Sequence, residues 1–346
     1  MAGLKKITLV MAGDEEGGLE KHVVELSNGL AARGYAVTLI AHAKYQSRLS
    51  QEVLFLAVDL SKSRRNPLVL WQLYQAIKAS QPDVLHVQAS KAVAMVAPLL
   101  KWLDVPCVAT VHGIKKNLNA YLQFDRIIAV SQQVASRFAT SQKVRVVWNG
   151  LQLPAVVSQH IRDKSGLQAI AIGRLVAVKG FDVLIAAWQG IDAKLWIVGD
   201  GPEEQALSQQ IQALGLQHRI ELLGYRADIA TLLAQSDVLI ISSRQEGGPY
   251  TLAEALLTKM PVLATDVGMV AEVLPPELIC EPDNVAALHT LLQKYLSDID
   301  TLNQISQPIY PFAQDHLSFA AMLDNTIAVY QELVAGDQNT RISPLP

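Results

Sequence analysis

Residues 237–256 read DVLIISSRQEGGPYTLAEAL, and this stretch decides the fold. It opens on an apolar run of branched residues, Val238–Ile241, which is typical of a buried parallel strand. It closes on leucines and alanines at the spacing of one helix face. Between the two stands Gly247-Gly248, where the missing side chains let backbone N–H groups approach a ligand closely. A strand, a glycine turn and a helix N-terminus together predict an anion site.

Two carboxylates flank this glycine turn, Glu246 before it and Glu254 in the expected helix. A carboxylate that faces a hydroxylated ligand accepts hydrogen bonds from neighbouring hydroxyls, so the pair could hold two sets of sugar hydroxyls. Carboxylates are mostly solvated surface groups, and an isolated pair would be interpreted in that way. The preceding strand and the glycine turn favour a ligand site instead.

The alternation of strand, loop and helix extends over almost the whole chain. Apolar runs bounded by glycine, proline and polar residues predict parallel strands with helices between them. We therefore expect an α/β protein with two Rossmann-like, doubly wound domains that face each other across a cleft, with ligands at the carboxyl ends of the strands. The expected strands are residues 7–11, 36–41, 53–58, 84–87, 107–112, 126–131, 144–148, 168–172, 194–198, 220–222, 238–241, 261–265 and 278–280.

A length of 346 residues is too great for one ordinary core, so two domains are expected. Residues 151–165 contain Pro154 and polar residues without firm periodicity, which predicts a linker. We place the first domain at residues 1–157 and the second at residues 158–311. The apolar spacing in the tail predicts one further helix over residues 312–334.

Charge is distributed unevenly between the two halves. Residues 1–157 carry a formal charge of +8 and the remainder −11, for a net charge of −3. The basic half could face an anionic partner, such as a nucleic acid or an acidic membrane surface, or its charge could simply be solvated. No run reaches the roughly 18 apolar residues of a membrane span, and acids rather than a cleavage site follow the short apolar run near the start. We therefore expect a cytoplasmic protein.

Further candidate residues lie on other loops. Arg174 and Lys179 share the loop after the first strand of the second domain, where both could reach one diphosphate. His112 ends a strand of the first domain, although a lone histidine is more often a packed residue. Gly17-Gly18 opens a helix without forming the GxGxxG pattern that a dehydrogenase needs.

One segment near the C-terminus, Asp298-Ile299-Asp300, has the DxD spacing of some metal sites. It is polar and follows no strand, so we reject it as a metal site. No other metal site is expected from the sequence.

Taken together, these residues resemble the retaining glycosyltransferases of the GT-B fold, in particular family four, the glycosyl transferases group 1. Each motif is weak alone, but their order along nearly the whole chain is specific. The chain departs from the family's common pattern at Gly248-Pro249, where Phe-Gly is frequent, and at Gln88, where a second histidine often follows His86. These departures leave the sugar undetermined. The motifs are Gly17–Glu20, Thr110–Gly113, Ala129–Ser131, Asn149-Gly150, Gly173-Arg174 with Lys179-Gly180, Gly199–Pro202, Leu223-Gly224, and Glu246 with Glu254.

The resemblance implies a nucleotide-sugar donor, expected to be UDP-linked, in the second domain and an acceptor in the first, with no cofactor or metal. It also implies that helix 312–334 crosses back onto the first domain. The implied catalytic set is His112, Glu246, Arg174 and Lys179. The implied contacts are Arg174 and Lys179 with the diphosphate, Gly17 and Gly18 with the phosphates, Glu254 with the ribose, Glu246 and the amides of Gly247 and Gly248 with the donor sugar, and His112 with that sugar.

The function implied is transfer of a hexose-type sugar, with retention, to a glycan or a lipid-linked glycan in bacterial lipopolysaccharide or exopolysaccharide synthesis. No carboxylate nucleophile is obvious near Glu246, so we expect front-face attack, with Arg174 and Lys179 stabilising the leaving diphosphate. Nucleic acid is not an expected partner, and contact with an anionic inner membrane face would be peripheral. The alternatives are a sugar-nucleotide epimerase on the same fold and a non-enzymatic sugar-binding protein.

Overall fold

The protein divides into two compact units. Unit 1 comprises residues 1–147 and 322–346, and unit 2 comprises residues 148–321. The predicted domain boundary and the predicted linker from residue 153 onward lie outside the described residues. The computed structural model describes residues 3–14, 17–114, 117–138, 142–152 and 166–340, with side chains as far as residue 335.

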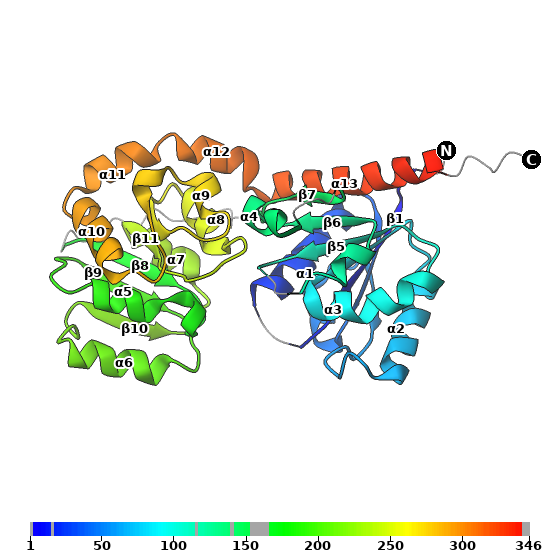
Figure 1. Ribbon diagram of the computed structural model, residues 1–346, viewed down its shortest axis with the longest axis horizontal. Coiled ribbons are helices and arrows are strands. Elements are labelled where there is room, and N and C mark those ends of the chain that lie inside the picture. The colour runs from blue at the N-terminus through cyan, green and yellow to red at the C-terminus, as the bar shows by residue number, and fades with distance from the viewer. Residues whose placement is uncertain (1–2, 15–16, 115–116, 139–141, 153–165, 341–346) are drawn as a thin grey trace, which may run out of the picture. The chain divides into compact units, whose positions relative to one another are not determined.

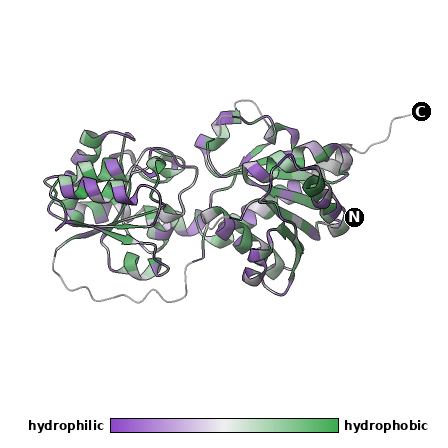
Figure 2. Cartoon of the chain, turned by 90° about the horizontal axis from the view of Figure 1, so that it is seen from below, coloured by the Kyte–Doolittle hydropathy of each residue, from purple (hydrophilic) through white to green (hydrophobic). Residues whose placement is uncertain are grey.

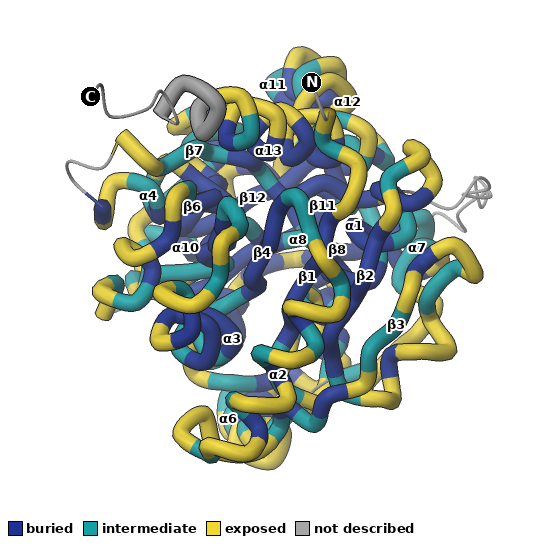
Figure 3. The backbone as a smooth tube through the Cα atoms, turned by 90° about the vertical axis from the view of Figure 1, so that its right-hand side faces the viewer, coloured by how far each residue is buried: buried dark blue, intermediate teal, exposed yellow. Residues whose placement is uncertain are grey.

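Unit 1 is built on a seven-stranded parallel sheet with the order β3-β2-β1-β4-β5-β6-β7. Its central strands are buried on both faces, which explains their near-continuous apolar sequences, and Figure 3 shows β1, β2 and β4 dark blue over most of their length. The strands are β1 (Lys6–Met11), β2 (Ala36–Ala41), β3 (Val53–Ala57), β4 (Val84–Gln88), β5 (Cys107–Val111), β6 (Arg126–Ala129) and β7 (Val144–Val146).

The helices of unit 1 differ in places from the predicted ones. The expected helix over residues 92–103 is an α-helix followed by a 3-10 helix, because Pro98 has no N–H to continue the α-helical pattern. Asn66 starts α2 by accepting hydrogen bonds from Leu68 N and Val69 N. The elements are α1 (Gly18–Ala32), η1 (Ala43–Arg48), α2 (Pro67–Ser80), α3 (Ala89–Val96), η2 (Ala97–Trp102), η3 (Tyr121–Gln123), α4 (Gln132–Ala135) and η4 (Ser136–Phe138).

Unit 2 repeats the same topology in a six-stranded parallel sheet with the order β10-β9-β8-β11-β12-β13. In both units the strand order reverses beside the first strand, which is the mark of a doubly wound fold. The predicted fold class, with two Rossmann-like units, is therefore confirmed. The strands are β8 (Gln168–Ile172), β9 (Lys194–Val198), β10 (Ile220–Gly224), β11 (Val238–Ile241), β12 (Val262–Thr265) and β13 (Ile279–Cys280).

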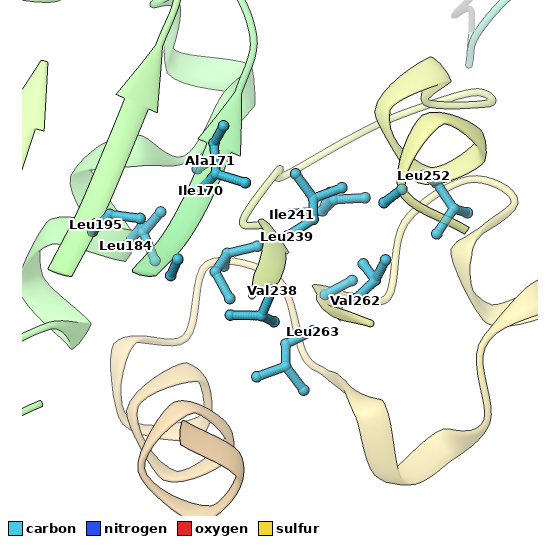
Figure 4. Packing of buried hydrophobic residues seen from close by; sticks show 14 of the residues in the cluster. Ile170, Ala171, Leu184, Leu195, Val238, Leu239, Ile241, Leu252, Val262 and Leu263 are labelled. Atoms are coloured by element: carbon cyan, nitrogen blue, oxygen red, sulfur yellow. The ribbon is translucent and has the colours of Figure 1, made fainter. Parts of the chain in front are cut away.

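The core of unit 2 forms around the strand that opens the deciding stretch. Figure 4 shows Leu239 of β11 between Ile170 of β8 and Val262 of β12, and all three side chains are fully buried. The helices are striped in hydropathy in Figure 2, as expected where one face lies against a sheet. They are α5 (Phe181–Ala187), α6 (Glu204–Ala213), α7 (Ile229–Ala234), α8 (Tyr250–Leu257), α9 (Val270–Val273), α10 (Val285–Leu296), α11 (Ile299–Ser306) and α12 (Ile309–His316), with η5 (Ala177–Lys179) and η6 (Pro276–Leu278).

The tail is two helices, so the prediction of one helix over residues 312–334 is wrong. Helix α12 ends at His316, and α13 (Phe319–Thr340) begins after a short break. At the break, Leu151 N donates to Leu317 O and Phe319 N donates to Leu151 O. These two bonds draw the backbone out of the helical path, and they come from a residue far away in the sequence.

Helix α13 packs on unit 1 from Met322 onward, as Figure 1 shows along β6 and β7. Glu332 pairs with Arg145 of β7, and Asp324 pairs with Arg33 at the end of α1. Tyr330 is fully buried and contacts His86 of β4. The last helix of the chain therefore completes the unit that the first residues begin.

Candidate active site

The loop after β8 and the loop after β11 meet in unit 2, because the two strands are neighbours in the sheet. Arg244 N donates to Val178 O at 2.8 Å, and Ser242 Oγ donates to Lys179 O at 3.0 Å. The two loops carrying Arg174, Lys179 and Glu246 thus form one continuous structure. This edge is also where the strand order reverses, the usual ligand position in such sheets.

Gly180 is what lets the two loops approach. Its φ is +64°, and a Cβ atom there would lie 2.2 Å from Ser242 O. Gly199, after β9, plays the same part for a third loop, with a φ of +140° and a virtual Cβ 2.0 Å from Gly173 O. Only glycine satisfies both the backbone angle and the contact at these positions.

Lys179 and Glu246 form an ion pair across the two loops. Lys179 Nζ lies 2.5 Å from Glu246 Oε1, and Ser243 Oγ donates to the same oxygen at 2.7 Å. The side chains are only 24% and 14% exposed. Because an ammonium has three N–H donors, Lys179 can keep this partner and still donate to a phosphate. The sequence prediction gave these residues separate ligands, and the structure brings them together.

Arg174 is different, since its side chain is exposed and makes no hydrogen bond or ion pair with the residues that the structure describes. Its backbone is nevertheless fixed, because Val176 N donates to Arg174 O and Leu175 N donates to Asp200 O. A cation on a fixed backbone without an internal partner is suited to an external anion.

Arg244 was not among the predicted site residues, yet it holds the loops in place. Its guanidinium binds both carboxylate oxygens of Asp182 at 2.8 and 2.6 Å, donates to Asp283 at 2.7 Å and donates to Ala177 O at 2.6 Å. The hydrogen bond from Arg244 lowers the pKa of Asp182, and the same bond raises that of Arg244. The only sequence signal for it is an arginine inside the deciding stretch.

The glycine turn is fixed by backbone and side-chain contacts. Met269 N donates to Gly247 O at 3.0 Å, and Asn149 Nδ2 donates to Gly248 O at 2.8 Å. Asn149 is 4% exposed, and its amide oxygen has no hydrogen-bond partner among the described residues. Pro249 is the N-cap of α8 and gives no side-chain cap, and Leu252 N donates to its carbonyl at 3.2 Å.

Glu254 lies in α8, more than one turn after the glycine turn, and is half-buried. Thr258 anchors its backbone carbonyl through Oγ1 at 2.8 Å. The two carboxylates of the motif therefore occupy different settings, Glu246 on a loop against a lysine and Glu254 within a helix.

The candidate residues of unit 1 lie at the ends of strands and at a helix start. Gly17 is the N-cap of α1, Gly18 is its first residue, and both are exposed. His112 follows β5 and is half-buried, with Nε2 2.8 Å from Gln88 Oε1. The His112 ring also meets that of His22 edge-on, with 5.0 Å between centroids. Their roles toward a ligand remain predictions.

Asp298 has a structural task in α11, where it is the N-cap and accepts from Thr301 N and Thr301 Oγ1. The described residues contain no group of three or more His, Cys, Asp or Glu side chains arranged to hold a metal. Among the helices of the described part of the chain, none has the length and apolar character that crossing a membrane requires.

Two family models match the sequence. The one described as Glycosyltransferase Family 4 matches residues 16–153, and the one described as Glycosyl transferases group 1 matches residues 157–310. A sequence relative is the lipopolysaccharide core biosynthesis glycosyltransferase LpsD of Rhizobium meliloti (strain 1021). It is 24% identical over 67% of this chain and 70% of its own length.

Solved structures resemble the whole chain. A glycosyltransferase of Rickettsia africae ESF-5 matches with a TM-score of 0.81 at 20% identity, over 96% of this chain and 99% of that one. HepE of Anabaena, in complex with UDP and glucose, matches with a TM-score of 0.77 at 20% identity, over 97% and 100%. These likenesses establish the GT-B fold.

The two family matches adjoin one another and together span most of the chain. The resemblance stated from the motifs is confirmed, and nothing in the comparisons favours an epimerase or a non-enzymatic sugar-binding protein. The chain therefore belongs to the glycosyl transferases group 1 family and is a glycosyltransferase of the GT-B fold, with relatives in lipopolysaccharide and polysaccharide biosynthesis.

Proposed function

We propose that the enzyme binds a nucleoside diphosphate sugar in unit 2 and an acceptor in unit 1, and transfers the sugar with retention of configuration. The observation that carries the donor assignment is the joined loop pair of unit 2. Its Lys179–Glu246 ion pair shares a loop with Arg174, whose guanidinium has no hydrogen-bond or ion-pair partner among the described residues. An anion there would meet two cations on backbone that is already fixed.

In this proposal different residues of unit 2 bind different parts of the donor. Arg174 and Lys179 hold the diphosphate, Glu254 the ribose, and Glu246 with the amides of Gly247 and Gly248 the sugar. The bond between the sugar's anomeric carbon and the diphosphate oxygen breaks, and the diphosphate leaves with the bonding electrons. The acceptor oxygen bonds to the same face of that carbon. Its proton passes to the leaving phosphate oxygen, so no protein nucleophile is required.

A UDP-linked donor is the best supported choice, since HepE of Anabaena has the same fold and was solved with UDP and glucose. The test is a screen in which the protein is incubated with UDP-, GDP-, ADP- and TDP-linked hexoses and hydrolysis is followed. Faster hydrolysis of a UDP-sugar than of the others supports the proposal. No turnover of any nucleotide sugar, by protein that binds UDP in calorimetry, would contradict it.

We also propose a glycan or lipid-linked glycan as acceptor, with unit 1 touching an anionic membrane from the side. Support comes from the LpsD relative and from a surface at the start of α2 that carries Leu68 and Trp71, which are 61% and 59% exposed. Arg64 and Arg65, immediately before that helix, are exposed as well. Aromatic and basic groups together favour a lipid headgroup layer.

Four further lysines contribute to the positive charge of the first half, but the structure does not assign them to this surface. Lys62 pairs with Asp59, and Lys44 donates to the backbone carbonyl of Asp14. Lys115 and Lys116 lie outside the described residues.

Co-sedimentation with vesicles of increasing anionic lipid content tests this contact. We expect binding at low salt that weakens at high salt. An Arg64→Glu/Arg65→Glu variant should lose it. Lys194→Glu/Arg219→Glu, which makes the same charge change in unit 2, should keep it. Equal binding by both variants would show that the surface at the start of α2 is not the one that contacts the membrane. No binding by the wild type would contradict the membrane contact itself.

A further inference from the structure

A connected group of polar side chains lies on one face of the unit 1 sheet. His86 and Gln88 are two residues apart on β4, so their side chains point to the same face. Gln88 is paired in register with Thr110 of the neighbouring strand β5. His112 lies two residues beyond Thr110 and reaches back to Gln88. Strand geometry thus brings four polar groups into one row.

Helix α13 covers the buried end of this row, at His86. His86 is 1% exposed, with Nδ1 2.5 Å from Tyr330 Oη and Nε2 2.6 Å from Thr110 Oγ1. Burial lowers the pKa of His86 to about 3, so the ring is neutral at ordinary pH. Both of its nitrogens therefore have fixed partners, one of them supplied by α13.

Gln88 connects this buried histidine with His112. The Gln88 side chain is 1% exposed, and its amide nitrogen lies 3.2 Å from His86 Nε2 and 3.4 Å from His86 Nδ1. Its amide oxygen lies 2.8 Å from His112 Nε2. Because an amide oxygen only accepts and an amide nitrogen only donates, the contact with His112 requires a hydrogen on His112 Nε2.

We propose that Gln88 is a positioning residue for His112, which it holds as the tautomer with hydrogen on Nε2, and that His86 and Tyr330 hold the Gln88 amide in the required orientation. The inference rests on the proposed sugar transfer, for which the family resemblance implies that His112 contacts the donor sugar. It also gives α13 a part in positioning His112, through Tyr330.

The amide has properties that other side chains at this position would lack. A glutamate would accept from His112 but add a charge that favours the imidazolium, whereas glutamine accepts without adding a charge. A histidine would bring a tautomer choice of its own. Glutamine has distinct donor and acceptor ends, so fixing one end fixes the other. The departure at Gln88 from the family's common pattern thus has a physical consequence for His112.

Nuclear magnetic resonance of the ¹⁵N-histidine-labelled full chain tests the tautomer without any ligand. We expect a His112 Nε2–H signal protected from solvent exchange, assigned by its loss in His112→Ala. Gln88→Met, which matches the length of glutamine but accepts only weakly, should lose the protection. Gln88→Glu restores a strong acceptor and should recover it. Gln123→Leu, at an exposed glutamine in η3, should match the wild type.

Two outcomes of this measurement would overturn the proposal. One is a hydrogen on His112 Nδ1 in the wild type. The other is an unchanged, protected Nε2–H signal in Gln88→Met. Neither depends on catalysis, so the tautomer is tested independently of the proposed function.

Turnover gives a second test. Losing the hydrogen bond to His112 should lower kcat of Gln88→Met by about tenfold, with a smaller change in donor KM, because the donor contacts of unit 2 are intact. Tyr330→Phe keeps the ring but removes the hydroxyl, and should show a smaller fall in the same direction. Unchanged kcat in folded Gln88→Met would overturn the positioning role. Full activity of His112→Ala would instead contradict the catalytic role that the family resemblance implies for His112.

Discussion

The loops of unit 2 and the polar row of unit 1 are organised by different forces. In unit 2, partly exposed charges hold the loops together through ion pairs, Lys179 with Glu246 and Arg244 with Asp182. In unit 1, the row from Tyr330 to Gln88 is buried and neutral, and each group is held by directional hydrogen bonds. Charges that retain some water can exchange partners with an anionic ligand. A neutral, buried row fixes an orientation but has little capacity to rearrange.

The largest expected difference between the units is their response to acid. Burial lowers the pKa of His22 to about 4 and that of His86 to about 3, against about 6.5 in an unfolded chain. Above pH 6.5 both histidines are neutral in the folded and in the unfolded chain, so their burial does not reduce the free energy of unfolding. Between 6.5 and 4 the unfolded chain binds protons that the folded unit refuses. As the pH decreases through this range, the free energy of unfolding of unit 1 therefore decreases by about 1.4 kcal/mol per pH unit for each histidine.

Hydrogen exchange, measured separately in peptides from β4 and β11, resolves this for the two units. We expect His86→Gln to show about half the wild-type slope in β4 between pH 6.5 and 4.5, since one of two protons is removed. His218→Gln, at an exposed histidine of unit 2, is the control and should leave the slope unchanged. Equal slopes in wild type and His86→Gln would show that His86 does not refuse the proton.

Replacing Arg174 should weaken donor binding without lowering the stability of the fold. Arg174→Ala removes a charge-assisted contact with the diphosphate, worth about 1.5–3 kcal/mol, which calorimetry with UDP would measure. Its melting temperature should match that of the wild type, because the exposed Arg174 side chain makes no hydrogen bond or ion pair with the described part of the chain. Unchanged UDP affinity would contradict the assignment.

Lys179 makes the matched comparison. Lys179→Met should also weaken UDP binding, but it leaves Glu246 without its ion-pair partner, so the melting temperature should fall. A Lys179→Met/Glu246→Gln double variant should regain stability without regaining affinity. A Lys179→Met protein as stable as the wild type would show that the pair contributes nothing to the fold.

Arg244 separates charge from geometry. Arg244→Lys keeps the positive charge but loses the two-pronged contact with Asp182. Because both groups are partly exposed, we expect a cost of only about 1 kcal/mol in unfolding free energy. Urea unfolding would measure it, and hydrogen exchange should rise in the loops after β8 and β11 before it rises in unit 1. Exchange confined to unit 1 would contradict the role of Arg244.

The smallest expected effect is that of a chelator. If the cations of unit 2 supply the charge that the leaving diphosphate requires, EDTA should leave turnover unchanged. A loss that Mg²⁺ or Mn²⁺ restores would show that a metal shares this task.

Local patterns were enough to predict the sheets. Strands β8, β9 and β11 have the predicted bounds, because their apolar runs are set off by polar residues and turns. The deciding stretch also forms the predicted strand before the glycine pair and the predicted helix after it. These features depend on neighbours in the sequence.

Contacts between distant residues could not be predicted in the same way. Leu151 bonds to the break between α12 and α13, and His86 contacts Tyr330. The guanidinium of Arg244 binds Asp182 and Asp283. No periodicity reveals such pairs, because each forms only after the sheet is assembled. The ion pair of Lys179 and Glu246 was missed for the same reason, although both residues were singled out.

The position of α13 has a consequence for how the protein is made. The sheet of unit 1 comes from the first part of the chain and Tyr330 from near its end, and the residues of unit 2 stand between them in the sequence. On the ribosome, unit 2 is therefore completed before unit 1, even though unit 1 is started first. Until Tyr330 emerges, His86 lacks the hydroxyl that meets its Nδ1. Translation of the final helix is thus the step that closes the earliest-made part of the molecule.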